Sequence, residues 1–294
     1  MKASPLKYLF TLALIATTIN YASAQRLPLY SESPIPLAKN NKGEQPAITM
    51  HRPTKQASRA AVIVCSGGAY GGRANGWEGD PAVKKLNEAG ITAFLLDYRV
   101  PKAEFMEQKW EVPLMDAQRA IQFARENASK YNIDPNQIGI MGFSAGGHLA
   151  ATAGTAFSNT LLSNPKNTPL RPDFMVLVYP VISFQDGLTH EGSRENLIGP
   201  ELDKAKIERF SLEKQVSENT PPAYITSGLD DSLVKVENSL HFAAALRQKG
   251  VPAELFLYQK GEHGYGVHNQ GAEKQWIDDC INWIKEGKFR NQKK

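Results

Sequence analysis

The segment of residues 137–157 constrains the fold more than any other part of the chain. Apolar residues around Ile140 predict a short buried strand, and an alanine-rich run from Ala145 predicts a helix. Between them lies Gly-Phe-Ser-Ala-Gly at 142–146, a G-x-S-x-G pattern. A strand that turns directly into a helix strains its corner residue and points that side chain outward, while flanking glycines allow close chain approach. The pattern therefore predicts Ser144 as a nucleophile.

Further apolar runs continue this alternation of strand and helix along the chain. Predicted strands cover 45–52, 60–65, 91–96, 174–179, 223–227 and 253–258, and predicted helices cover 81–89, 113–131, 236–249 and 272–286. A long polar connection at 183–222 contains a helical pattern near 202–210. Largely apolar strands that alternate with helices predict an α/β fold, in which helices cover both faces of a mostly parallel central sheet. No repeat or linker interrupts the pattern, so we expect a single domain.

The N-terminus carries the features of a secretory signal peptide. Lys2 and Lys7 precede an apolar run at 8–15, and the small residues Ala-Ser-Ala follow at 22–24. The apolar run is too short to span a bilayer. We therefore expect a signal peptide at 1–24, export to the periplasm or the medium, and no membrane association after its removal.

The remaining sequence divides into an extended lead-in at 25–44, rich in proline and polar residues, and a catalytic domain at 45–294. The formal net charge of the 294 residues is only +4, and the one basic run is the tail at 285–294. This distribution does not favour nucleic-acid binding.

The two cysteines, Cys65 and Cys280, fall within predicted regular elements. A disulfide would suit an exported protein, but this placement favours two buried thiols.

A serine nucleophile needs a histidine as its base. His263 follows the last predicted strand within a glycine-rich loop at 260–266, and the loops at the carboxyl ends of parallel strands meet at one edge of the sheet. His263 is therefore the favoured base, and His268 is its main rival. His148 lies one turn along the helix from Ser144 and is expected to be structural.

The histidine in turn needs an acid to orient it, after a strand between the nucleophile and the histidine. Asp230 and Asp231 both follow the predicted strand 223–227. One carboxylate can face the histidine while the other caps a turn, so the pattern leaves the choice open.

The oxyanion of the reaction needs backbone donors. One is the N–H of Ala145, directly after the nucleophile, and the other is expected from the segment Gly67-Gly68-Ala69, after the strand 60–65. A glycine-rich loop after a strand can instead bind a dinucleotide, with Asp97 as the ribose acid. Ala69 interrupts the required G-x-G-x-x-G, which weakens that alternative.

Four segments together resemble a known family: Ser-Gly-Gly-Ala-Tyr-Gly-Gly at 66–72, the stretch 132–150, the stretch 190–199, and Gly-Glu-His-Gly-Tyr-Gly at 261–266. They resemble the α/β-hydrolase esterases, in particular the acetyl xylan esterase-like group of exported bacterial carbohydrate esterases. The resemblance covers 45–285. It implies an α/β-hydrolase fold, a serine esterase activity on acetylated carbohydrate such as xylan, and no metal or organic cofactor.

The resemblance also implies roles for individual residues. The catalytic set is Ser144, Asp231 and His263, and the oxyanion donors are Gly68, Ala69 and Ala145. Asp231 is favoured over Asp230 because two residues separate the family's acid from a Val-Pro pair, and here Ser232 and Leu233 separate Asp231 from Val234, which Lys235 follows in place of proline. Ala69 stands where the family often has a third glycine, and its methyl group is expected to narrow the acyl pocket.

Four aromatic residues lie in or near the loops expected to face the site and are candidate substrate contacts: Tyr70, Trp77, Trp110 and Tyr265. Two alternative functions remain open from the sequence. A prolyl-peptidase-type serine peptidase shares the fold but has a large N-terminal gating domain that this sequence lacks. A non-catalytic binding protein on a hydrolase scaffold is disfavoured by the intact catalytic set. The sequence leaves the oligomeric state open.

Overall fold

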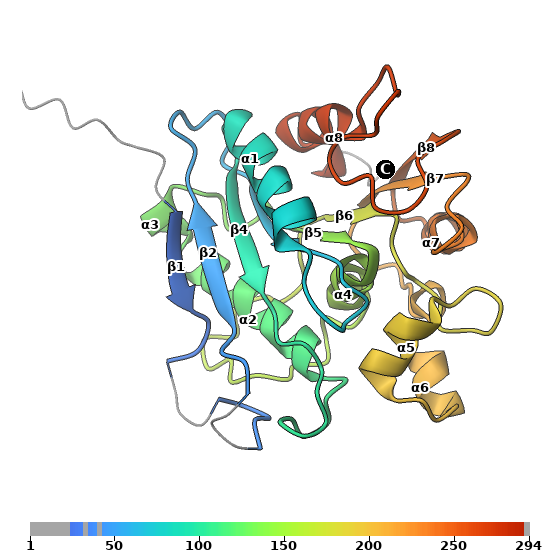
Figure 1. Ribbon diagram of the computed structural model, residues 1–294. Coiled ribbons are helices and arrows are strands. Elements are labelled where there is room, and N and C mark those ends of the chain that lie inside the picture. Colours follow the sequence, from blue (N-terminus) through green and yellow to red (C-terminus); the bar gives the residue numbers. More distant parts are fainter. Residues whose placement is uncertain (1–23, 32–34, 40–42, 291–294) are drawn as a thin grey trace, which may run out of the picture.

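Across residues 24–31, 35–39 and 43–290, which the computed structural model describes, eight strands form one sheet in the order β1-β2-β4-β3-β5-β6-β7-β8 (Figure 1). The strands are β1 (Ala24–Pro28), β2 (Ala47–His51), β3 (Ala61–Cys65), β4 (Thr92–Asp97), β5 (Ile138–Phe143), β6 (Met175–Val178), β7 (Ala223–Gly228) and β8 (Ala253–Tyr258). β2 runs antiparallel to both β1 and β4, and the other neighbours are parallel. The predicted α/β-hydrolase sheet is confirmed.

Helices cover both faces of this sheet (Figure 1). They are α1 (Asp80–Glu88), α2 (Val112–Glu126), α3 (Ala128–Tyr131), α4 (Ser144–Thr155), α5 (Glu191–Ile198), α6 (Lys204–Arg209), α7 (Glu237–Gln248) and α8 (Trp276–Lys285). Shorter turns are the π-helical η1 (Asn75–Gly79) and the 3₁₀ turns η2 (Leu212–Lys214) and η3 (Lys288–Arg290). Buried residues of α1 and α8 share one core cluster, whereas those of α2, α4 and α7 share the other. The sheet separates these two layers.

Several predicted boundaries differ from the structure. The helix predicted at 113–131 is divided at Asn127, whose side-chain amide donates to the Phe123 carbonyl and ends α2. The helix predicted from Ala272 starts only at Trp276, because the Gln275 side chain bonds the carbonyls of Asn269 and Ala272 and holds a loop there. The helix α5 was not predicted.

The predicted lead-in contains a strand that the sequence pattern did not reveal. β1 forms an antiparallel edge on β2, with Leu27 opposite Ile48, although most of its residues are exposed. An exposed edge strand lacks the apolar signature that marks a buried one. The predicted signal peptide lies outside the described residues except for Ala24, the first residue of β1.

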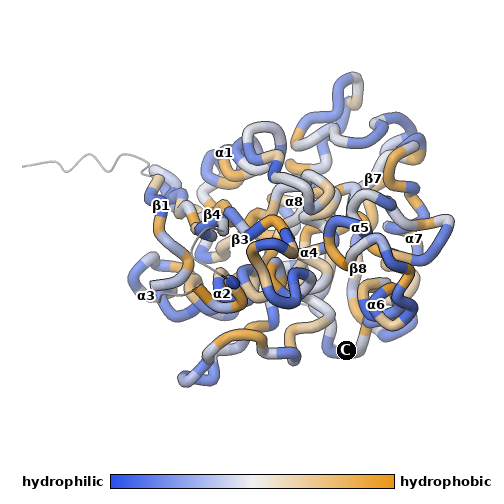
Figure 2. Tube along the Cα trace, turned by 60° about the horizontal axis from the view of Figure 1, so that its bottom comes forward, coloured by the Kyte–Doolittle hydropathy of each residue, from blue (hydrophilic) through white to orange (hydrophobic). Residues whose placement is uncertain are grey.

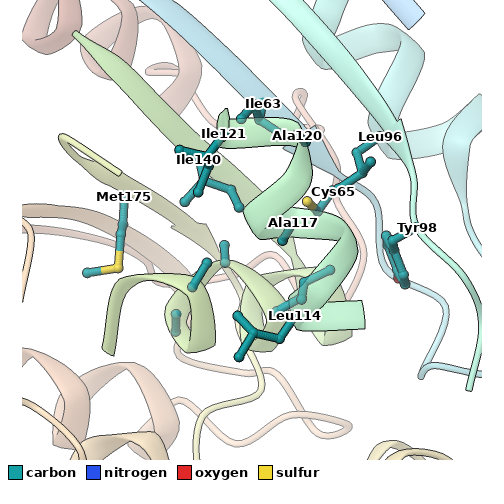
Figure 3. Close-up of a cluster of buried hydrophobic side chains, with 14 of the residues drawn as sticks. Ile63, Cys65, Leu96, Tyr98, Leu114, Ala117, Ala120, Ile121, Ile140 and Met175 are labelled. Atoms are coloured by element: carbon teal, nitrogen blue, oxygen red, sulfur yellow. The ribbon is translucent and has the colours of Figure 1, made fainter. Parts of the chain in front are cut away.

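Side chains of β3 alternate between the two core layers, as the two-residue period of a strand requires. Ile63 and Cys65 point to the layer of α2 and α4, where they meet Leu96 and Ala117 (Figure 3). Figure 2 shows the hydrophobic stretches gathered toward the middle of the molecule. Cys65 and Cys280 lie in different layers, and both are unpaired, buried thiols, as expected.

The lead-in is attached to the domain by a buried ion pair. Arg99 and Asp116 are 2.7 Å apart with side chains 1% and 0% exposed. Asp116 also accepts from the Tyr30 hydroxyl at 2.9 Å, and Arg99 donates to the Pro36 carbonyl at 2.7 Å. One charged pair therefore joins the loop after β4, helix α2 and the lead-in.

Among the described residues, no helix is long and apolar enough to cross a membrane.

We expect Asp116→Ala to lower the free energy of unfolding by about 3–5 kcal/mol, since it leaves the Arg99 guanidinium buried without its counter-charge. Urea unfolding followed by circular dichroism measures this change. The control is Glu88→Ala, which removes the exposed Lys84–Glu88 pair and should change the stability by under about 1 kcal/mol. Equal effects of the two substitutions would contradict the role given to the buried pair.

Candidate active site

The corner between β5 and α4 places Ser144 at the carboxyl edge of the sheet. Ser144 has a φ of +52°, in the left-handed region that non-glycine residues rarely adopt. The flanking glycines are required by close approach: a Cβ on Gly142 would lie 2.0 Å from the Gly146 carbonyl oxygen, and one on Gly146 would lie 2.3 Å from that of Cys65. The chain therefore approaches itself too closely at this corner for a side chain at position 142 or 146.

Three side chains distant in sequence form one hydrogen-bonded series. His263 Nε2 lies 2.9 Å from Ser144 Oγ, and His263 Nδ1 lies 2.8 Å from Asp231 Oδ2. The Asp231 carboxylate is fully buried, and its Oδ1 accepts from the N–H groups of Leu233 at 3.0 Å and Val234 at 2.8 Å. The series therefore orients the His263 ring, with Nδ1 facing the Asp231 carboxylate and Nε2 facing the Ser144 hydroxyl.

The structure resolves the choice between the two adjacent aspartates. Asp230 turns away from the imidazole, and its Oδ1 accepts from the N–H groups of Gly261 at 2.8 Å and Glu262 at 2.9 Å. Asp231 contacts the ring itself, and Asp230 holds the loop that carries it. The rival base His268 is exposed and is not the histidine that contacts Ser144.

The loop after β3 lies directly against the serine. A Cβ on Gly67 would be 2.9 Å from Ser144 Cβ. Gly68 and Ala69 have positive φ values of 125° and 54°, and within the described residues neither N–H donates to another protein group. The Gly67 N–H, in contrast, donates to Glu78 Oε2 at 2.6 Å. The N–H groups of Gly68 and Ala69, both predicted as oxyanion donors, are therefore available, whereas the N–H of Gly67 is engaged by Glu78.

The dinucleotide alternative loses its support in the structure. The Gly68 carbonyl accepts from the N–H groups of Gly71 and Gly72, so the loop curls onto itself and does not present those donors to a phosphate. Asp97 accepts from Asn75 Nδ2 at 2.8 Å and from Arg26 at 3.1 Å. Its carboxylate is therefore engaged by protein groups.

The four aromatic candidates occupy very different environments. Tyr70 is 1% exposed and bonds His148, and Tyr265 is 8% exposed and bonds Thr226, so both rings are packed in the core. Trp110 is partly buried with the Lys206 ammonium over its ring. Burial of the Tyr70 ring contradicts its prediction as a substrate contact, whereas Tyr265, although mostly buried, lines the same cavity as Trp77 and His263.

Trp77 is 66% exposed, and its Nε1 donates to the Gly264 carbonyl at 2.7 Å. It borders a cavity of about 760 Å³ between the start of α1 and the loop 260–270. His263, His268 and Asn269 also line this cavity. An exposed ring therefore stands beside the candidate base, next to polar side chains.

The family model BD-FAE matches residues 48–246. The chain belongs to the BD-FAE family. An acetylxylan esterase of Xylanibacter ruminicola is 33% identical to this BD-FAE protein over 93% of the chain and 53% of that relative. Endo-1,4-beta-xylanase B of Butyrivibrio fibrisolvens is 38% identical over 74% of the chain and 34% of that relative. The chain thus spans between a third and about half of the length of these curated relatives.

A solved structure agrees with this assignment. The acetyl ester-xyloside bifunctional hydrolase from Caldicellulosiruptor lactoaceticus is 37% identical, with a TM-score of 0.81 over 93% of this chain and 99% of that one. A truncated carbohydrate esterase from gut microbiota shares the fold at 23% identity, with a TM-score of 0.73. The resemblance inferred from the motifs is confirmed.

Sequence reasoning missed two residues at the site of this BD-FAE protein, Glu78 and Tyr179. Glu78 is 4% exposed in η1 and receives hydrogen bonds from Gly67 and from the Tyr179 hydroxyl. Glu78 lies in Gly-Trp-Glu-Gly-Asp-Pro at 76–81, which is typical of a turn before a helix and gives no signal of burial.

Among the described residues, no cluster of three or more His, Cys, Asp or Glu is arranged to hold a metal ion.

His148 is structural in this BD-FAE protein, as expected. Its Nε2 lies 2.9 Å from the Phe210 carbonyl, its Nδ1 lies 2.9 Å from the Tyr70 hydroxyl, and its ring stacks on Phe184. Complete burial lowers the pKa of His148 to about 4. The imidazole is therefore a neutral part of the core.

This burial predicts a loss of stability in acid. Between about pH 6.5 and pH 4 the unfolded chain binds a proton at position 148 that the folded chain does not, so stability falls as the pH falls through this window. The full contribution is about 3 kcal/mol. Urea unfolding at several pH values should show a flatter dependence for His148→Gln than for the wild type. The control His241→Gln, at an exposed position of α7, should keep the wild-type slope; a wild-type slope in His148→Gln would contradict the prediction.

Proposed function

We propose that this BD-FAE protein is a serine esterase that removes acetyl groups from carbohydrate such as acetylated xylan. The observation that carries the proposal is the continuous hydrogen-bonded series from Asp231 through His263 to Ser144. This arrangement suits acyl transfer through a covalent intermediate. The relative named acetylxylan esterase and the structural neighbour named acetyl ester-xyloside hydrolase support an acetyl ester as the substrate.

In the first half-reaction, His263 Nε2 takes the proton of Ser144 as Oγ attacks the ester carbonyl. Asp231 keeps the Nδ1 proton in place and stabilises the imidazolium that forms. The tetrahedral intermediate then collapses, and the protonated imidazole gives its proton to the departing sugar hydroxyl. The products of this step are the free sugar hydroxyl and an acetyl group bound to Ser144.

In the second half-reaction, a water molecule takes the place of the sugar. His263 removes a proton from the water, the resulting hydroxide attacks the acetyl carbonyl, and collapse releases acetate and returns the proton to Ser144. In both steps the negative oxygen faces the N–H groups of Gly68, Ala69 and Ala145, which we assign as the oxyanion donors. Removal of one such donor typically lowers kcat by about 10²–10³.

We further propose that the protein is exported by the segment 1–24 and meets its substrate outside the cytoplasm. The positive start, the apolar run and the small residues before Gln25 support this. Release of acetate from acetylated polysaccharide outside the cell is consistent with such a location.

The adjacent aspartates provide a matched test of the catalytic assignment. Ser144→Ala should abolish turnover of p-nitrophenyl acetate, and Asp231→Asn should lower kcat about 10³–10⁴-fold because the amide favours the wrong imidazole tautomer. Asp230→Asn retains an oxygen for the Gly261 and Glu262 N–H groups and should lower kcat less than tenfold. Steady-state kinetics on variants of equal stability check these values. Undiminished turnover in Ser144→Ala would remove Ser144 from its assigned role.

The substrate is tested with the same wild-type protein on three kinds of compound. We expect release of acetate from acetylated xylan and turnover of p-nitrophenyl acetate, with no cleavage of a proline-containing peptide. Cleavage of the peptide without ester turnover would instead identify a peptidase. Binding to acetylated xylan without any turnover would identify a non-catalytic protein.

Trp77 is proposed to contact a sugar ring on the alcohol side of the ester. Its exposed ring lies on the cavity that His263 also lines. Trp77→Ala should raise KM for an acetylated xylo-oligosaccharide about tenfold above that of Trp77→Phe, equivalent to about 1.4 kcal/mol. Both variants lack the Nε1 bond to Gly264, so their difference reports the ring face alone. Equal KM values in the two variants would contradict the proposed contact.

A further inference from the structure

A buried carboxylate lies beside the proposed reaction centre without taking part in the proposed proton transfers. Glu78 is 4% exposed, and its Oε2 accepts from the Gly67 N–H at 2.6 Å. A Cβ on Gly67 would lie 2.9 Å from both Glu78 Oε2 and Ser144 Cβ. The carboxylate therefore holds the residue that precedes the proposed oxyanion donors, directly against the nucleophile.

The second oxygen of Glu78 is connected to the histidine loop through one tyrosine. The Tyr179 hydroxyl donates to Glu78 Oε1 at 3.0 Å and accepts from the Gly266 N–H at 3.1 Å. The Tyr179 ring also packs edge-on against the His263 imidazole, with ring centres 4.8 Å apart. Tyr179 thus contacts His263 directly and bonds the loop three residues after it.

Other residues of the same turn bond the same two loops. Asn75 Oδ1 accepts from the Ser66 hydroxyl at 2.6 Å, on the oxyanion side. Trp77 Nε1 donates to the Gly264 carbonyl at 2.7 Å, directly after His263. The turn η1 is therefore bonded to both loops that must be aligned for acyl transfer.

Both oxygens of the buried Glu78 side chain are engaged by protein groups. Burial raises the pKa of its carboxyl group, which means that the surroundings penalise the charged form. A carboxylate accepts at both oxygens, whereas a neutral amide offers one acceptor oxygen. The carboxylate therefore accepts from the Gly67 N–H and from the Tyr179 hydroxyl at the same time, whereas an amide at this position would accept from Gly67 and donate to the tyrosine oxygen.

We propose that Glu78 is a positioning residue that fixes the oxyanion loop relative to His263, through Gly67 on one side and Tyr179 on the other. The inference rests on the proposed esterase function. A small error in the placement of aligned groups can lower the rate about 10²-fold, so loss of this link should act on kcat. Substrate contacts elsewhere in the cavity are not changed by it, so KM should change little.

The test is the kinetics of p-nitrophenyl acetate hydrolysis for Glu78→Ala, Glu78→Gln and Tyr179→Phe. Glu78→Ala should lower kcat about 10²-fold with KM within about twofold of the wild type. Glu78→Gln should remain within about tenfold, because the amide oxygen still accepts from Gly67 and the amide nitrogen can donate to the tyrosine oxygen. Tyr179→Phe should lower kcat about tenfold, since it leaves the Gly266 N–H without its acceptor.

The double variant Glu78→Ala with Tyr179→Phe should be no slower than Glu78→Ala alone, because both substitutions break the same link. The matched control is Tyr258→Phe. The Tyr258 hydroxyl likewise accepts a backbone N–H, from Trp276, and donates to the Lys274 carbonyl, but it does not contact His263 or Glu78. This control should keep the wild-type kcat.

The outcomes separate this inference from the proposed function. If the wild type hydrolyses the ester and both Glu78→Ala and Tyr179→Phe keep its kcat, the positioning role alone is overturned. Absence of wild-type turnover would overturn the esterase function and the positioning role with it. If Glu78→Ala does not fold, Tyr179→Phe, which removes a single oxygen atom, still decides between a lowered and an unchanged kcat.

Discussion

The close approach of the chain to itself at the end of β5 is the constraint on which the site depends. The carbonyl groups of Gly146 and Cys65 occupy the space where side chains at 142 and 146 would lie. Glycine at both positions allows β3, β5 and the start of α4 to lie this close together, with Ser144 at a positive φ. The strain is tolerated because β5 and the helix α4 up to Gly154 are buried and closely packed, so the surrounding structure holds the corner in place.

Carboxylate side chains hold the loops of the site in place by accepting hydrogen bonds from their backbone N–H groups. Asp230 binds the loop of His263, Asp231 binds its own turn as well as the imidazole, and Glu78 binds the loop after β3. Each carboxylate accepts charge-assisted hydrogen bonds, which are stronger and shorter than neutral ones. Loops without regular structure can therefore present groups at fixed distances above the edge of a rigid sheet.

Much of the fold was predictable because its strands carry a strong local signal. The central strands β3 to β7 are buried on both faces, and the continuous apolar runs that this requires are visible in the sequence. The edge strand β1 was missed because exposed residues dominate it, and the helix α5 was missed because two of its buried residues, Ser193 and Arg194, are polar and give no apolar period. The division of the predicted helix at Asn127 depends on a side-chain bond that periodicity does not reveal.

The sequence alone was enough to predict the family, the candidate nucleophile and the candidate base, because a G-x-S-x-G corner and the glycine-rich histidine loop are local patterns with a local physical cause. Only the tertiary structure decided between Asp230 and Asp231, buried Tyr70 and Tyr265 while leaving Trp77 exposed, and brought Glu78 against Gly67. These outcomes depend on which segments meet across the sheet edge. The burial of a side chain and its hydrogen-bond partners depend on segments that are distant in the sequence, so one segment alone does not predict them.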